Sequence, residues 1–166
     1  LGVCNGEIST ASLSVTLNGV RFRKNVRRNV QYGGLYITNF KGTGLLFEEL
    51  NWSIASKDAP HVENCGIGMT IDNNSNAITI TGGQFINSTT YNVEVLGANA
   101  ITLVGGVNQN AGTAGIRIDN GSTGSLQAAF GTSVLGIYFE DNGTSNIIAS
   151  NGRGLSVNGC YFNGSG

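Results

Sequence analysis

The stretch Ile78-Thr-Ile-Thr-Gly-Gly-Gln-Phe85 decides the fold of this 166-residue chain, because its pattern returns about once every 23 residues. Apolar residues alternate with polar ones, a glycine follows, and a large apolar residue closes the phrase. The closing position is filled in turn by Phe22, Phe40, Val62, Phe85, Asn108, Phe139 and Phe162. A repeat of this kind predicts a solenoid in which each copy buries the apolar face of the next.

Each copy carries two strand signals with a turn between them. Ile78-Thr-Ile80 predicts a short strand with both isoleucines inward, and Asn92-Val-Glu-Val95 predicts a second strand after a polar loop. A glycine three residues before the closing position predicts a sharp corner, and it recurs as Gly19, Gly82, Gly105, Gly136 and Gly159. Since all copies run in one direction, we predict an all-β parallel β-helix of about seven rungs, forming one domain over residues 1–166.

Composition excludes several classes of function. Charged residues make up 11% of the chain and the net charge is -1, which argues against a nucleic-acid partner. No apolar run approaches the roughly 20 residues that span a bilayer, so we expect no membrane insertion. The chain begins at Leu1 and ends in the turn-like Asn163-Gly-Ser-Gly, and we therefore expect it to be an excerpt of a longer protein.

Cysteine and histidine give no sign of a metal site or a cofactor. Cys4, Cys65 and Cys160 occupy unrelated positions of the repeat, and the single His61 has no second histidine or Cys-x-x-Cys beside it. We expect small buried cysteines, a plain surface histidine, no metal and no cofactor. A basic run, with Arg21, Arg23, Lys24, Arg27 and Arg28, predicts either a patch for anionic partners or a solvated loop.

The phrase Ile-Thr-Ile-x-Gly-x-x-Phe, followed by a polar loop and an apolar-x-apolar strand, resembles the right-handed, single-stranded parallel β-helix of the pectate-lyase-like superfamily. The low charge and the rungs rich in Asn, Gly and Thr are most similar to a bacteriophage tailspike or tail-fibre β-helix. The asparagine ladder of that family is largely missing at the site before the corner glycine, where only Asn18 and Asn158 occur. The resemblance implies a homotrimer, an extracellular or virion location, and binding or cleavage of bacterial surface polysaccharide.

Carboxylates on the second strand are the candidate catalytic residues. By analogy with the same fold, the outer face of this strand forms the substrate groove, with Asp72, Glu94 and Asp119 as catalytic residues and Arg117 and Thr70 as binding residues. Glu94 is expected about 8 Å diagonally from each aspartate, within the roughly 6.5 to 9.5 Å of inverting glycosidases. The alternative is an ordinary cross-strand ion pair between Glu94 and Arg117.

Aromatic residues give a second candidate binding site. Tyr138 and Tyr161 precede the closing position in successive copies and should stack on the outer face, where they suit either a sugar or a subunit contact. Three functions remain: a tailspike-like β-helix that binds, and with active carboxylates also depolymerises, polysaccharide; a purely structural trimeric shaft; and a secreted adhesin solenoid without catalysis.

Overall fold

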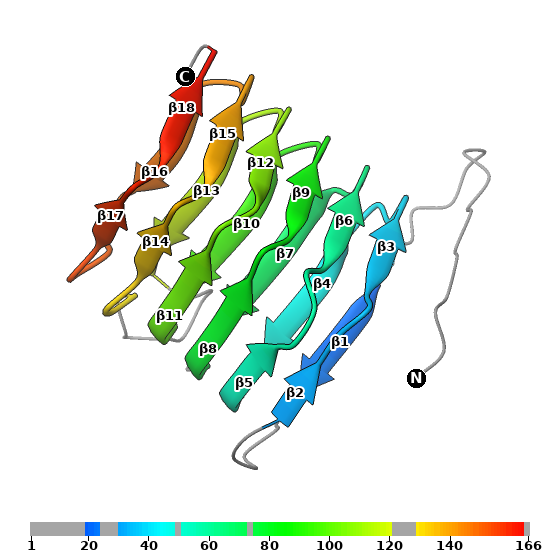
Figure 1. Cartoon of the computed structure of the whole chain (residues 1–166), viewed down its shortest axis with the longest axis vertical. Coiled ribbons are helices and arrows are strands. Elements are labelled where there is room, and N and C mark those ends of the chain that lie inside the picture. The colour runs from blue at the N-terminus through cyan, green and yellow to red at the C-terminus, as the bar shows by residue number, and fades with distance from the viewer. Residues whose placement is uncertain (1–18, 24–29, 49–50, 73–74, 121–128, 165–166) are drawn as a thin grey trace.

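A computed structural model describes residues 19–23, 30–48, 51–72, 75–120 and 129–164, and in these residues all regular structure is β. Three parallel six-stranded sheets stack the rungs along one axis (Figure 1). Sheet A contains β1 (Val20–Arg23), β4 (Thr43–Glu48), β7 (Ile67–Asp72), β10 (Tyr91–Leu96), β13 (Ala114–Asp119) and β16 (Ser145–Ala149). Sheet B contains β2 (Val30–Tyr32), β5 (Trp52–Ser56), β8 (Asn76–Thr81), β11 (Asn99–Val104), β14 (Ser133–Leu135) and β17 (Ser156–Asn158). Sheet C contains β3 (Tyr36–Thr38), β6 (His61–Glu63), β9 (Gln84–Ile86), β12 (Val107–Gln109), β15 (Tyr138–Glu140) and β18 (Tyr161–Asn163).

The predicted parallel β-helix is therefore confirmed, with six strands per sheet in the described residues in place of about seven rungs. Each rung contributes one strand to each sheet, so a rung has three strands where the repeat predicted two. The candidate copy around Leu17 lies outside the described residues. Within the same ranges, no helix is long and apolar enough to cross a membrane.

The closing position of the repeat corresponds to one column of sheet C. Its members are Ile37, Val62, Phe85, Asn108, Phe139 and Phe162. The placements of Phe22 and Phe40 in this column are wrong. Phe22 lies in β1 of sheet A and stacks on Phe47 with ring centroids 5.0 Å apart, while Phe40 follows β3 and packs in the core. Their separation of 18 residues is too short for a full turn.

Left-handed backbone conformations turn the chain at the corners. Gly82, Gly105, Gly136 and Gly159 have φ between 62° and 68°, as the recurring glycine predicted for these four; Gly19 precedes β1 and is not one of them. A second corner follows sheet C, where Asn39, Asn64, Asn87, Asn110 and Asp141 have φ between 48° and 63°. Asparagine and aspartate tolerate this region better than other side chains. An asparagine column is therefore present two residues after the closing position, not before the glycine.

A third left-handed column contains alanine and gives a stability prediction. Ala77 and Ala100 have φ of 54° and 52°, are exposed, and occupy the position that Gly131 fills one rung later. We expect Ala77→Gly to raise the free energy of unfolding by about 0.5 kcal/mol, because the relief of left-handed strain exceeds the entropy cost of glycine. Urea denaturation measures it. Ala149→Gly, at an exposed strand position, is the control and should lower the free energy of unfolding by a similar amount. Changes of the same sign and size in the two variants would contradict the strain argument.

Buried asparagines connect the rungs inside the solenoid near the turn from sheet C to sheet A. Asn92, Asn108 and Asn142 are each at most 1% exposed. Asn92 Nδ2 donates to Asn108 Oδ1 at 3.0 Å, and Asn142 Nδ2 donates to Asn108 O at 3.0 Å. Asn142 Oδ1 accepts from the backbone N–H of Ala111 at 3.0 Å. Asn108 thus fills an apolar column without leaving its amide unpaired, since its Nδ2 donates to Gly115 O.

Candidate functional site

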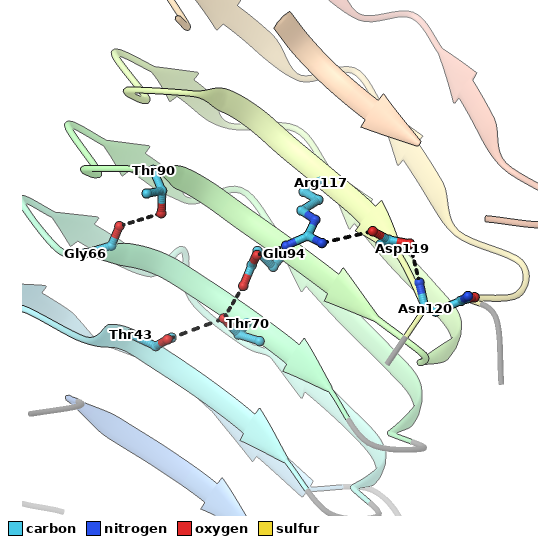
Figure 2. Close-up of polar contacts among 8 residues, drawn as sticks. All are labelled: Thr43, Gly66, Thr70, Thr90, Glu94, Arg117, Asp119 and Asn120. Atoms are coloured by element: carbon cyan, nitrogen blue, oxygen red, sulfur yellow. Dashed lines mark hydrogen bonds and ion pairs between the residues drawn. The ribbon is translucent and has the colours of Figure 1, made fainter. Parts of the chain in front are cut away.

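The outer face of sheet A brings the predicted carboxylate cluster together. Glu94 is paired in register with Thr70 on one side and with Arg117 on the other. Asp72 and Asp119 both pair with Leu96, two residues further along the strands, and so lie diagonally from Glu94 as predicted. Figure 2 shows Glu94 between Thr70 and Arg117, with Asp119 beyond the guanidinium.

Arg117 bridges two of the candidate catalytic carboxylates. Its Nη1 lies 3.1 Å from Glu94 Oε1 and its Nη2 lies 2.9 Å from Asp119 Oδ2 (Figure 2). The other Glu94 oxygen accepts from Thr70 Oγ1 at 3.3 Å, and Thr70 in turn shares a hydrogen bond of 3.4 Å with Thr43. The guanidinium also lies 5.4 Å from the centroid of the Tyr91 ring. The ion pair named as the alternative is therefore present.

Burial distinguishes this cluster from a solvated groove. Glu94 is 4% exposed, Thr70 5% and Asp72 8%, although the register points all three away from the core. Burial raises the pKa of Glu94, and the charge and hydrogen bonds of Arg117 and the Thr70 hydroxyl offset part of that rise. In contrast, hydrogen bonds from Asn151, Arg117 and the Asn120 backbone lower the pKa of Asp119.

The two carboxylates thus have opposite shifts, which is the pattern of an acid paired with a base. Their oxygens are nevertheless occupied, since both Glu94 oxygens accept hydrogen bonds and Asp119 Oδ1 accepts from Asn151 at 2.7 Å. A glycosidic oxygen would reach Glu94 only after Arg117 or Thr70 moved. In this conformation the cluster is a closed network that, with Thr43, joins four neighbouring strands of sheet A.

Sheet C presents an open polar and aromatic face. Tyr138 and Tyr161 are register partners, and their rings stack with centroids 5.4 Å apart and an interplanar angle of 6°. Tyr161 is 62% exposed. Asn163 Nδ2 donates to Tyr138 Oη at 3.1 Å and to Glu140 Oε1 at 3.0 Å, so an amide and a carboxylate lie beside the pair. The predicted stacking of the tyrosines is confirmed.

The same face holds His61, which has more partners than the sequence suggested. Its ring stacks on Tyr36 with centroids 4.7 Å apart. Nδ1 lies 2.8 Å from Gln84 Oε1 and Nε2 lies 3.0 Å from Glu63 Oε2. The expectation of a plain surface histidine without a positioned partner is wrong. Gln84 in the same column of the repeat, and Glu63 two residues after His61, were the sequence signals that could have identified these partners.

The remaining candidates contribute little to a site. Of the basic run, Arg21 forms an ion pair with Glu48, Arg23 belongs to β1, and the other three residues lie outside the described ranges. Cys65 is buried, which raises its thiol pKa, Cys160 is half-buried, and Cys4 is not described. In the parts of the chain that the structure describes, no group of three or more His, Cys, Asp or Glu side chains could hold a metal ion.

Fold and surface together place the chain in the class of parallel β-solenoids with weakly charged, polar outer faces. No protein-family model, no curated protein and no solved structure matches it.

Proposed function

We propose that this solenoid is an extracellular or virion-borne, tailspike-like protein that binds bacterial surface polysaccharide through sheet C. The observation that carries the proposal is the parallel stack of the half-buried Tyr138 on the exposed Tyr161, with Asn163 and Glu140 beside it. Binding sites for small molecules commonly combine aromatic surface with a few placed polar groups. Tyrosine rings offer a flat apolar surface to a sugar ring, and amides and carboxylates bond to its hydroxyls.

A binding experiment tests this assignment. We expect the protein to bind at least one polysaccharide on an array of bacterial capsules and O-antigens, and Tyr161→Ala to weaken that binding at least tenfold, since it removes half of the stacked surface. Titration calorimetry with the array hit gives the affinity. Tyr36→Ala is the matched control, being an exposed tyrosine five rungs away on the same face. Equal losses in the two variants, or no binding to any polysaccharide, would reject the assignment.

Depolymerisation at Glu94 and Asp119 is the second candidate, and the opposite pKa shifts of these carboxylates favour it. Arg117 and Thr70 would then bind the substrate after leaving Glu94, with Asp72 as a further acid. Binding ranks first because Tyr161 is exposed and Tyr138 half-buried, while Glu94 is buried. A reducing-end assay on the polysaccharide that binds on the array decides between binding and depolymerisation. Release of oligosaccharides would favour depolymerisation.

A homotrimer is the assembly that we propose. Sheet B supports it, because none of its strands contains a charged residue, whereas the strands of sheet A carry acidic and basic side chains and those of sheet C carry Glu63 and Glu140. The core of a protein interface is depleted in charge. Sedimentation equilibrium tests the assembly, and a stable monomer would count against it. A trimer without glycan binding would favour the purely structural shaft.

A further inference from the structure

A notch opens where the chain passes from sheet C to sheet A. The backbone stacks residues of successive rungs there: Ile67 N donates to Gly42 O at 3.2 Å, Thr90 N to Gly66 O at 3.1 Å, and Thr113 N to Thr90 O at 2.8 Å. By strand register, Gly42 and Gly66 directly precede sheet A at the position that Thr90, Thr113 and Thr144 hold in later rungs, and only these three threonines carry side chains. A cavity of about 390 Å³ lies at the two glycines. We call it the corner notch.

Backbone packing explains why residue 66, which lines the corner notch, is a glycine. A Cβ atom on Gly66 would lie 2.1 Å from the carbonyl oxygen of Lys41, a distance that no side chain can adopt. Residue 66 must therefore remain glycine while the rungs keep their spacing. The volume of the notch lies within the range of about 300 to 1,000 Å³ of small-molecule sites.

The lining of the notch favours an anion with hydroxyl groups. Lys41 and Thr89 are exposed and supply an ammonium group and a hydroxyl, and Ile67 supplies apolar surface. No acidic residue lines the notch, and among the described residues no carboxylate pairs with Lys41.

The carboxylate of Glu94 is connected to the notch through hydrogen bonds, and Arg117 already neutralises its charge. Thr43, which lines the notch, is linked through Thr70 to Glu94 (Figure 2). Glu94 is paired with Arg117 and is 4% exposed. Lys41 is therefore the charge that a ligand in the notch would meet.

We infer that the corner notch binds the carboxylate of an acidic sugar unit, with Lys41 pairing the carboxylate and Thr89 bonding a ring hydroxyl. The choice of a sugar rests on the proposed function, while the selectivity for negative charge rests on the notch itself. Ile67 offers apolar surface to the C–H groups of the sugar ring. The notch lies at the start of sheet A, away from the stacked tyrosines on sheet C, and so adds a second contact for a long glycan.

Methyl β-glucuronide and methyl β-glucoside are the probes, because they differ in a carboxylate at one carbon. In amide ¹H–¹⁵N NMR titrations, we expect the glucuronide to shift the amides of Ile67, Thr89 and Thr90 and to bind several times more tightly than the glucoside. Lys41→Gln should weaken glucuronide binding about threefold to fivefold, as for one partly exposed ion pair, and leave the glucoside unchanged. Lys57→Gln, which removes an exposed lysine elsewhere, is the matched control.

Equal affinity for the two sugars, shifts confined to other residues, or equal effects of the two lysine variants would overturn the notch assignment. The outcome of the Tyr161→Ala experiment does not depend on the notch assignment. If the protein binds no polysaccharide but glucuronide still shifts the notch amides, the proposed function is rejected and the charge-selective notch is kept. If it binds polysaccharide but glucuronide causes no such shifts, only the notch is rejected.

Discussion

Replacing Asn142 with alanine is expected to lower the free energy of unfolding by about 3 kcal/mol, because buried groups on two neighbouring rungs lose their partners. The Asn142 amide accepts from the N–H of Ala111 and donates to the carbonyl of Asn108 and to Asn146 Oδ1. Alanine offers none of these bonds, and water cannot reach a side chain that is 0% exposed. Chemical denaturation followed by circular dichroism measures the loss.

Asn163→Ala is the matched control for Asn142→Ala. Asn163 also makes two side-chain hydrogen bonds, but to the exposed groups of Tyr138 and Glu140, which water can satisfy. We expect it to cost less than about 1 kcal/mol. Similar costs in the two variants would show that the interior asparagines do not support the stack in the way their hydrogen bonds suggest.

Arg117→Met is expected to destabilise the protein by about 2 kcal/mol at pH 8 and far less at pH 4. The variant leaves Glu94 buried without its cation, and the cost stays below that of a fully buried pair because the Arg117 side chain is 34% exposed. Burial already raises the folded-state pKa of Glu94 above its ordinary value, and loss of Arg117 would raise this pKa further. The free energy of unfolding that depends on protonated Glu94 is fully present below the unfolded-state pKa of about 4.3. It is lost as the pH rises through the folded-state pKa of Glu94.

The double variant Glu94→Gln/Arg117→Met checks that the carboxylate causes this loss. Glutamine removes the buried charge and still accepts from Thr70, so the pH dependence of the single variant should disappear. Asp119 should change little, since Asn151 is the first cause of its lowered pKa. Urea midpoints at pH 4 and pH 8 give the comparison. A destabilisation that is the same at both pH values, or that persists in the double variant, would assign the effect to lost packing.

The sequence predicts the fold well where the repeat is regular. From Val62 to Phe162 each closing residue lies one full turn after the last, because inward positions must be apolar or internally hydrogen-bonded. The prediction fails at Phe22 and Phe40 because the first turn is irregular. Phe22 lies in sheet A, and Phe40 lies between β3 and β4 and belongs to no strand. An apolar pattern identifies a buried side chain, and it does not identify the sheet that carries it.

The sequence predicted where the residues of the candidate site lie, but it did not predict that Glu94 is buried. Strand alternation and register place Glu94 beside Arg117 and Thr70, as expected. The burial of Glu94 depends on side chains packing around it in three dimensions, which a one-dimensional period does not contain. Gln84, one of the two partners of His61, and the lining of the corner notch depend on residues about one turn apart, so they are identified only once the register is known.

The asparagine column after sheet C also makes one rung a segment that recombination can duplicate or delete as a whole. Asn64 and Asn87 occupy equivalent corners, so residues 64–86 form a segment of 23 residues that starts and ends at the same point of the turn. Recombination between two such asparagines would duplicate or delete a whole rung, changing the length of the rod by about 4.8 Å while every junction keeps its geometry. Lineages of such a protein can therefore gain or lose outward-facing surface in whole steps, and outward residues can diversify while the corners stay constant.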